Sequence, residues 1–280
     1  MKHFVLVFAA TASILAACQP LIRDAREYSE HQQVGLGEAV SQLALQDEIG
    51  QLNAVLEANE QDTFAGLWIQ HEPDYRIIVA FTKNGQKTIR SYIENKPWAG
   101  LVKVRPAKYT YEELQAAQRI AHSAVHQFCI DVESAIDVTQ NRVELYVYDP
   151  RQVEAALQPV GIQLPASVTL IQVNEMSSMT ALLAGELVLV DGCLRAKNPD
   201  ADVSDVLILP PKYTLRMDGS TAEIITKDGQ VVAHIGDRVD VGEGEIPVEA
   251  MDQCMFKKLP TGCLGPYWFV GSISLTGRPK

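Results

Sequence analysis

The order of strand and helix patterns between residues 101 and 173 is the feature that most constrains the fold. Apolar side chains recur at every second residue in a half-buried strand and at every third or fourth residue in a helix. Asp149-Pro150 suits a helix start, because Asp caps free N–H groups and Pro fits the first helical position. The expected elements are a strand at 100–105, a helix at 111–128, strands at 133–138 and 143–148, a helix at 149–158 and a strand at 168–173.

The segment before residue 101 predicts one helix and three strands. Apolar residues at helical spacing indicate a helix over 37–60. Strand patterns follow at 64–69 and 75–82. Asn84-Gly85 then favours a tight hairpin turn, because both residues tolerate a positive φ. The partner strand is expected at 87–93, which makes a three-strand meander.

From residue 185 the chain changes to short strands separated by tight turns such as Asp191-Gly192 and Asp228-Gly229. Strands at this regular spacing are typical of a small all-β barrel or sandwich. We therefore predict the fold class α+β. A ferredoxin-like (βαββαβ) unit forms most of an N-terminal domain at 35–173, a linker spans 174–184, and a small all-β, OB-like barrel occupies 185–280.

The chain begins with one firm positive charge and then an uncharged apolar or small run from Phe4 to Ala17. A run of this length suits a signal-peptide core and is too short to cross a bilayer as a helix. The run ends in Leu15-Ala16-Ala17-Cys18, which resembles a bacterial lipobox. The alternative is an ordinary cleaved signal with a chance cysteine.

The lipobox resemblance implies residues 1–17 as a lipoprotein signal peptide and Cys18 as the lipidated first residue of the mature chain. It also implies attachment to the bilayer through the acyl chains, and residues 18–34 are expected to be a tether. Gln19 occupies the position where an Asp often retains such proteins at the inner membrane. The resemblance therefore implies the periplasmic face of the outer membrane.

Composition excludes several functions. The formal net charge is −11 and the apolar content of 47% is ample for a buried core. Lys and Arg look scattered along the sequence, and binding to a phosphate backbone needs clustered cations. We therefore expect no nucleic-acid partner, and we expect the acyl group rather than charge to supply the membrane affinity.

Four cysteines remain besides Cys18, namely Cys129, Cys193, Cys254 and Cys263. An export compartment permits disulfides, and four cysteines allow three complete pairings. We prefer Cys193 with Cys263, because this bond would tie the barrel's first strand to its last. A local bond between Cys254 and Cys263 is the alternative.

Two stretches resemble known proteins. Residues 62–150, through Phe64-Ala65-Gly66-Leu67-Trp68-Ile69 and Asn141-Arg142-Val143-Glu144-Leu145, resemble the pro-region of streptogrisin-type and α-lytic-type secreted serine proteases. This resemblance implies a prodomain-like fold that offers a sheet edge to a protease, although no protease domain follows. Residues 185–275 resemble an uncharacterised β-rich domain of exported bacterial lipoproteins, through segments such as Cys263-Leu264-Gly265-Pro266-Tyr267-Trp268.

Candidate chemistry is sparse. His122, His126 and Cys129 lie at helical spacing that suits a zinc site, but no fourth ligand is evident, and surface histidines with a buried cysteine explain the same pattern. We therefore expect no metal and no cofactor. Tyr267 and Trp268 are a candidate binding surface, and the alternative is a packed barrel corner.

The sequence shows no set of residues suited to act together as acid, base and nucleophile. The expected function is based on this observation. We expect a lipid-anchored envelope protein that is not an enzyme and acts as a binding or scaffold module, with another envelope protein as its partner. One alternative is a trans-acting inhibitor or folding helper of an exported serine protease. Another is a hydrolase whose site is assembled from residues distant in the sequence.

Overall fold

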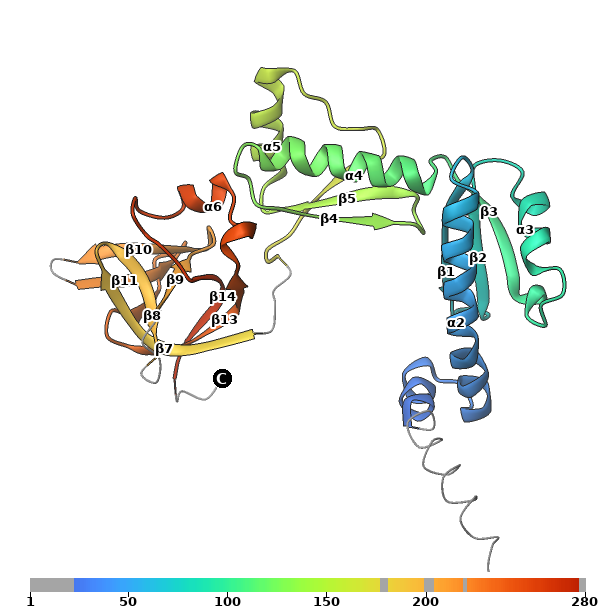
Figure 1. The fold of residues 1–280 in the computed structure, drawn as a ribbon, viewed down its shortest axis with the longest axis horizontal. Helices are drawn as coiled ribbons and strands as arrows, with labels where there is room; N and C mark the ends of the chain where they lie inside the picture. The colour runs from blue at the N-terminus through green and yellow to red at the C-terminus, as the bar shows by residue number, and fades with distance from the viewer. Residues whose placement is uncertain (1–22, 177–180, 199–203, 219–220, 277–280) are drawn as a thin grey trace, which may run out of the picture. The chain divides into compact units, whose positions relative to one another are not determined.

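The computed structural model describes residues 23–176, 181–198, 204–218 and 221–276. The fold is mixed α/β with several sheets, and the chain divides into two compact units (Figure 1). Unit 1 comprises residues 1–123, 134–145 and 163–171, and unit 2 comprises 124–133, 146–162 and 172–280. The expected signal peptide and Cys18 lie outside the described residues.

Unit 1 contains a three-stranded sheet in the order β1-β2-β3. Strands β1 (Phe64–Gln70) and β2 (Arg76–Phe81) are antiparallel, whereas β3 (Val102–Pro106) runs parallel to β2. The connection from β2 to β3 contains α3 (Gly85–Ile93) and a short 3-10 turn, η1 (Ala99–Leu101). This is a strand-helix-strand crossover.

The predicted hairpin at Asn84-Gly85 and the meander are therefore wrong. Asn84 does adopt a positive φ of 55°, but it precedes a helix and not a returning strand. Ile89 is buried, and Ile93, four residues later, also packs on the core. The helical spacing of these apolar residues thus predicts the structure of this segment better than the two-residue turn signal does.

The core of unit 1 lies between this sheet and its helices. The 24-residue helix α2 (Leu36–Asn59) packs on β1, as Figure 1 shows. The buried core residues are Ile49, Leu52 and Leu56 of α2, Phe64, Ile77, Val79 and Phe81 of the strands, and Ile89 and Trp98 of the crossover.

Residues 23–32, within the expected tether, form a helix. Ala25 is fully buried, so this helix is packed against other parts of the protein. The Tyr28 hydroxyl donates to the Gln42 side-chain oxygen at 2.9 Å and lies 3.4 Å from Nδ1 of His71. Apolar and polar contacts together attach this segment to the body of unit 1, which its charged composition did not indicate.

The elements expected over 101–173 occur in the predicted order. They are β3, α4 (Tyr111–His126), β4 (Val132–Asp137), β5 (Arg142–Val147), α5 (Pro150–Leu157), the short turn η2 (Gln158–Val160) and β6 (Val168–Gln172). However, β3 pairs with β2, while β4, β5 and β6 form a separate three-stranded sheet. The ferredoxin-like assignment is therefore not confirmed, because it needs all four strands in one sheet.

Unit 2 is built around five strands that close into a ring in the order β13-β14-β9-β8-β7. The ring strands are β7 (Ala181–Val190), β8 (Cys193–Lys197), β9 (Ser204–Ile208), β13 (Arg238–Ile246) and β14 (Tyr267–Leu275). A separate sheet holds β10 (Tyr213–Asp218), β11 (Thr221–Thr226) and β12 (Val231–His234). Part of the expected linker, residues 181–184, belongs to β7, and residues 177–180 lie outside the described residues.

The connection from β13 to β14, residues 247–266, carries the short turn η3 (Val248–Ala250) and the helix α6 (Gln253–Lys257). The ring encloses an apolar core that includes Leu187, Leu207, Val241 and Val270. Among the described residues, no helix combines the length and the apolar character that crossing a membrane requires.

Candidate functional site

Tyr267 and Trp268, the expected binding surface, are buried. Their exposed fractions are 2% and 8%. Tyr267 packs with Cys193 and Cys263 in one apolar cluster, and Trp268 packs in the core of the strand ring. The binding-surface prediction is therefore wrong, and the packed-corner alternative describes these residues, because each side of β14 faces an apolar cluster.

The structure contains the preferred disulfide and a second one. Cys193 and Cys263 are bonded, with an S–S distance of 2.11 Å and a Cα–Cα distance of 5.6 Å. The other bond joins Cys129 to Cys254 across 125 residues. Both Cys254 and Cys263 lie in the β13–β14 connection, so each bond ties this connection to another segment of unit 2.

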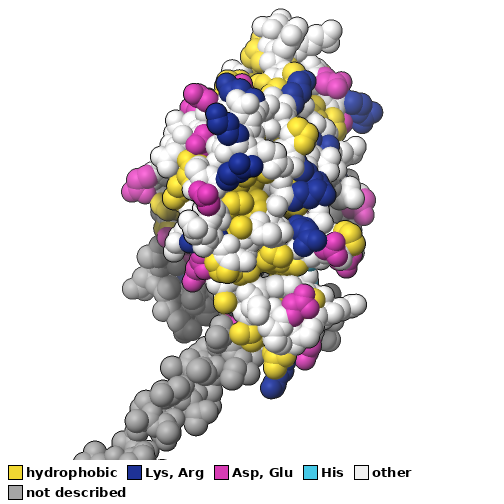
Figure 2. Space-filling view, turned by 90° about the vertical axis from the view of Figure 1, so that its right-hand side faces the viewer, with side chains coloured by type: hydrophobic (Ala, Val, Ile, Leu, Met, Phe, Trp, Pro, Cys, Tyr) yellow, Lys and Arg dark blue, Asp and Glu magenta, His cyan; other side chains and the backbone are white. Residues whose placement is uncertain are grey.

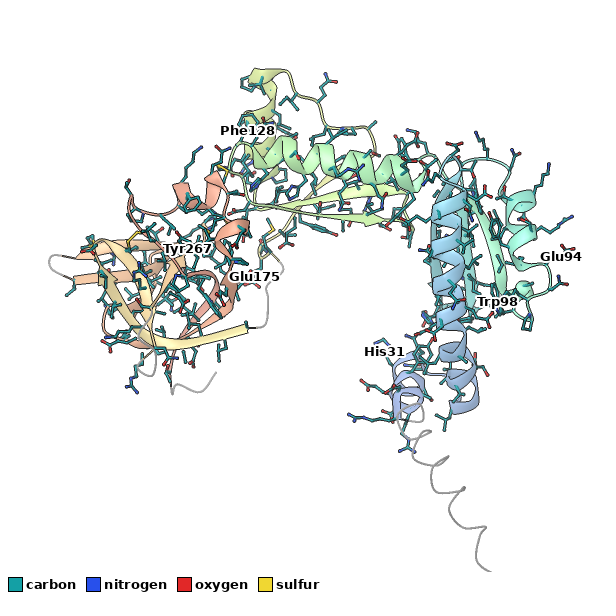
Figure 3. The ribbon with its side chains drawn as sticks, in the orientation of Figure 1. His31, Glu94, Trp98, Phe128, Glu175 and Tyr267 are labelled. Carbon is teal, nitrogen blue, oxygen red and sulfur yellow. A yellow bond between two sulfur atoms is a disulfide. The ribbon has the colours of Figure 1, made fainter. Side chains whose placement is uncertain are left out.

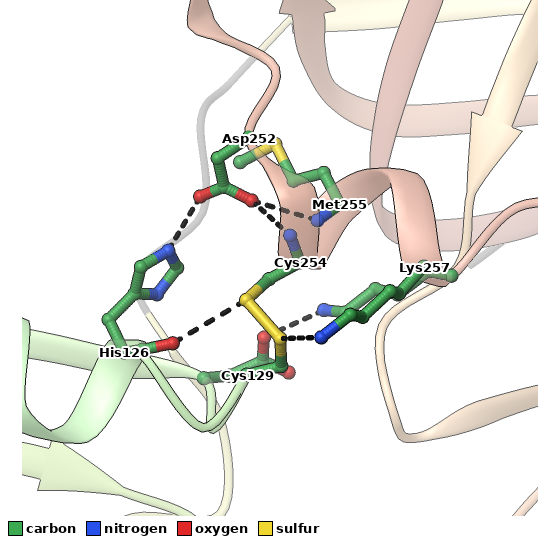
Figure 4. Close-up of a disulfide and its surroundings, with 8 residues drawn as sticks. His126, Cys129, Asp252, Cys254, Met255 and Lys257 are labelled. Atoms are coloured by element: carbon green, nitrogen blue, oxygen red, sulfur yellow. Dashed lines mark hydrogen bonds and ion pairs between the residues drawn. A yellow bond between two sulfur atoms is a disulfide. The ribbon is translucent and has the colours of Figure 1, made fainter.

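The second disulfide and a new partner change the surroundings of the predicted zinc ligands His122, His126 and Cys129. Cys129 is oxidised, and Nε2 of His126 lies 2.5 Å from Oδ2 of Asp252 (Figure 4). Asp252 also caps α6 by accepting from the backbone N–H groups of Cys254 and Met255 at 2.8 and 2.9 Å. Sequence reasoning missed Asp252, because 126 residues separate it from His126 and only an Asp before a five-residue helix marked it.

The electrostatics of Asp252 follow from these contacts. Burial by itself would raise the pKa of this carboxyl. The N–H of Met255 and the side chain of His126 donate to it and stabilise its charged form. On balance the pKa of Asp252 lies below its ordinary value. The carboxylate is therefore a persistent negative charge beside the Cys129–Cys254 bond.

A positively charged region in unit 1 was also missed. Between residues 83 and 108 the chain has seven exposed cations and one acidic residue, Glu94; the cations are Lys83, Lys87, Arg90, Lys96, Lys103, Arg105 and Lys108. We call residues 83–108 the basic segment. The sum of these charges is 7 − 1 = +6, in a chain whose formal net charge is −11.

Figure 2 views the molecule from the side on which α3 lies in Figure 1 and shows several Lys and Arg side chains across this face, with Asp and Glu mostly toward its edges. Among the described residues, Lys96 is the one cation of this segment with a carboxylate partner, Glu48 at 3.1 Å. The expectation that cations are scattered is therefore wrong for the basic segment, in which seven cations stand against one acid. Val104 of β3 packs toward α3, so Lys103 and Arg105 lie on the opposite face of the sheet from Lys87 and Arg90 of α3.

The β13–β14 connection has the opposite character, with exposed apolar side chains on a fixed backbone. The exposed fractions are 61% for Val248, 44% for Phe256 and 73% for Leu264. The Phe256 and Tyr267 rings make a T-shaped contact with centroids 6.0 Å apart, and a guanidinium nitrogen of Arg195 donates to the Leu264 carbonyl at 2.7 Å. Figure 3 places Tyr267 among the side chains of unit 2. A long loop held by two disulfides loses little conformational entropy when it binds.

No model of a known protein family matches this chain, and no curated protein matches it either.

Proposed function

We propose that this protein is a lipid-anchored scaffold of the bacterial cell envelope that works by binding and not by catalysis. The anchor is the acylated Cys18, on the strength of the Leu-Ala-Ala-Cys segment after an apolar run. Two disulfides support an oxidising compartment outside the cytoplasm. In this proposal the periplasmic face of the outer membrane holds the anchor.

The observation that carries the proposal is the basic segment. Seven exposed cations with one acid give this segment a local charge of +6, which fits the phosphate-bearing head groups of anionic lipids. The described part of the docked helix starts at Arg23, five residues after Cys18. Five residues span roughly 17 Å at most, so unit 1 is held beside the bilayer. The acyl chains were expected to supply the membrane affinity by themselves, and in this proposal the basic segment adds a second, electrostatic contribution.

Vesicle binding tests the basic segment. A chain with Cys18→Ser measures the charge contribution without the acyl chains. The triple substitution Lys83→Gln, Lys87→Gln, Arg90→Gln removes three exposed cations on or just before α3, each contributing about 1 kcal/mol near an anionic surface. We therefore expect roughly 100-fold weaker binding to vesicles of mixed zwitterionic and anionic phospholipid, and weaker binding of the parent chain at high salt.

The matched control is Lys197→Gln, Lys227→Gln, Arg238→Gln, which removes the same charge from exposed positions in unit 2. The control is expected to bind vesicles like the parent chain. Equal losses in the two triple variants, or binding that does not depend on the anionic lipid, would show that the basic segment is not the membrane contact.

Intact mass of the chain extracted from cells tests the anchor itself. The expected species begins at Cys18 and carries acyl chains. A chain that retains Met1 without modification, or one cleaved elsewhere, contradicts the anchor and the compartment together.

We propose the β13–β14 connection as the surface for a partner protein of the envelope. We further propose that the strand ring is an OB-like barrel. The cyclic order β7-β8-β9-β14-β13 and the parallel pairing of β9 with β14 support this proposal. In barrels of this type the loop between the fourth and fifth strands is one of the two that bind ligands, and the β13–β14 connection occupies that position.

Crosslinking in cells followed by mass spectrometry tests the second surface. Leu264→Ser removes the most exposed apolar side chain of the connection, and Met217→Ser, at 59% exposure on β10, is the matched control. We expect crosslinks from unit 2 to a partner protein to be lost in Leu264→Ser and kept in Met217→Ser. The same crosslinks in both variants would remove the connection from the proposal.

One observation favours a second candidate function, inhibition of an exported serine protease. Leu264 follows the disulfide-bonded Cys263 directly and is 73% exposed, so a fixed backbone presents a side chain that suits the apolar specificity pocket of a chymotrypsin-like enzyme. We expect the purified protein to inhibit such an enzyme and Leu264→Asp to abolish the inhibition. Unchanged protease activity in the presence of excess protein removes this candidate.

A further inference from the structure

Four side chains with metal-binding atoms meet at the Cys129–Cys254 bond in unit 2. Nε2 of His126, a carboxylate oxygen of Asp252 and Sγ of Cys254 lie within 4.8 Å of one another. Sγ of Cys129 is bonded to Sγ of Cys254. Two short segments, 126–129 and 252–254, therefore supply a histidine, a carboxylate and two sulfurs, all of them ligand types that zinc accepts.

We propose that this disulfide covers a zinc site, which forms when the bond is reduced. A dithiol reductant transfers two electrons and two protons to the bond, becomes a disulfide itself, and leaves Cys129 and Cys254 as thiols. Zinc then binds as the two thiols lose their protons to solvent. The ligands are the two thiolates, Nε2 of His126 and a carboxylate oxygen of Asp252.

Little movement separates the oxidised cluster from this geometry. Zinc–sulfur bonds of about 2.3 Å at tetrahedral angles put two sulfurs roughly 3.8 Å apart. The Cα atoms of Cys129 and Cys254 lie 5.1 Å apart, so the two side chains can adopt this spacing once the bond is broken. The imidazole nitrogen and carboxylate oxygen, now 2.5 Å apart, must separate to roughly 3.3 Å. Sγ of Cys129 lies outside the group of three close ligand atoms, so its side chain must turn toward His126 and Asp252 once the bond is broken.

The surroundings of the cluster suit the charges of a zinc centre. Two thiolates and one carboxylate with Zn²⁺ sum to −1. Nζ of Lys257, 3.8 Å from Sγ of Cys129, supplies a compensating positive charge (Figure 4). Cys254 is 4% exposed, so water has little access to one of the sulfurs. Zinc would also keep the β13–β14 connection crosslinked after the disulfide is lost, which gives the site a structural role.

The other disulfide is an internal control. Cys193 and Cys263 are buried among apolar residues, and within the described residues the one group of three or more such ligands is the His126–Asp252–Cys254 group. Reduction of both bonds should therefore create one zinc site and not two. His122 offers a second control, since it lies one helical turn before His126 on α4 and outside that group.

Protection from alkylation tests the proposal on the full chain. Both bonds are reduced with a phosphine, the reductant is removed without oxygen, and iodoacetamide is added with and without one equivalent of zinc. Mass spectrometry then gives the alkylation rate of each cysteine. We expect zinc to slow alkylation of Cys129 and Cys254 at least tenfold and to leave Cys193 and Cys263 unchanged. Cobalt in place of zinc should give the visible absorption of a tetrahedral thiolate complex.

Variants separate metal binding from a purely structural contact. His126→Ala should lose the protection, His122→Ala should keep it, and Asp252→Asn should weaken it while retaining an oxygen that caps α6. Circular dichroism of each reduced variant reports its folding. Equal protection of all four cysteines, no protection, or the same protection in His126→Ala and His122→Ala would overturn the proposal, and none of these outcomes bears on membrane binding.

Discussion

Removal of the Cys193–Cys263 bond by Cys193→Ala and Cys263→Ala should destabilise unit 2 strongly. The bond closes 70 residues, and the chain-entropy model gives about 4 kcal/mol for a loop of that size at 25 °C. Both cysteines are almost fully buried, at 3% and 4% exposure, and each substitution also removes a sulfur atom from a packed cluster. The expected loss in free energy of unfolding is therefore about 4 kcal/mol or slightly more.

Urea unfolding followed by ¹⁹F NMR of 5-fluorotryptophan measures this loss. Trp268 lies in the core of the strand ring, whereas Trp68 and Trp98 belong to unit 1, so each unit has its own signal. With a typical slope of about 2 kcal/mol per molar urea, the Trp268 transition should shift down by roughly 2 M. The Trp98 transition is the control and should stay in place.

A shift of the Trp268 transition below about 0.5 M would refute the reasoning. It would mean that the unfolded chain gains little freedom when the bond is absent, or that the fold of unit 2 does not depend on this crosslink. The single substitutions Cys193→Ala and Cys263→Ala should match the double variant, because either one breaks the bond.

Three further outcomes are expected. Ile77→Ala, at a fully buried core position, should cost roughly 2–5 kcal/mol of unfolding free energy in urea titrations, whereas Ile120→Ala, at 59% exposure, should change it by less than about 0.5 kcal/mol. Gly66→Ala should cost about 1–3 kcal/mol, because Gly66 has φ 135° and an added Cβ would lie 2.8 Å from both Cβ and Cγ1 of Val138. If the loss is as large when Val138 is also replaced by Gly, the contact is not its cause. The pKa of Asp252 is lower in the folded than in the unfolded chain, so the stability that this carboxylate adds to the fold is present above about pH 4 and is lost as the pH falls through the folded pKa. Asp252→Asn should therefore reduce the loss of stability at acid pH. An unchanged loss in this variant would contradict the lowered pKa of Asp252.

Local signals predicted much of the secondary structure. The helix over 37–60 corresponds to α2 at Leu36–Asn59, and Asp149 caps α5 by accepting from the N–H of Arg151 at 3.0 Å. These features depend on neighbours within a few residues, so the sequence contains what determines them. The hairpin at Asn84-Gly85 failed for the complementary reason, since a left-handed residue can begin a helix as well as a turn.

The pairing of strands was harder to predict from the sequence than their positions. The sequence placed β3 correctly but could not show that it pairs in parallel with β2, which comes before it, and not with β4 or β6. A strand's own apolar pattern identifies its buried face but not its neighbour. That choice depends on how α3 packs across the sheet.

The features of the candidate sites also divide into those that the sequence determined and those that only the tertiary structure decided. By itself the sequence determined the apolar N-terminal run ending at Cys18 and the positions of the four remaining cysteines, because composition and spacing are local properties. It favoured the Cys193–Cys263 pair but left Cys254–Cys263 open as the alternative. Only the tertiary structure decided that Cys193 bonds to Cys263, that Cys129 bonds to Cys254, and that Asp252 meets His126. Each of these depends on contacts across long sequence separations or between packed elements, and such contacts form only when apolar burial brings distant segments together.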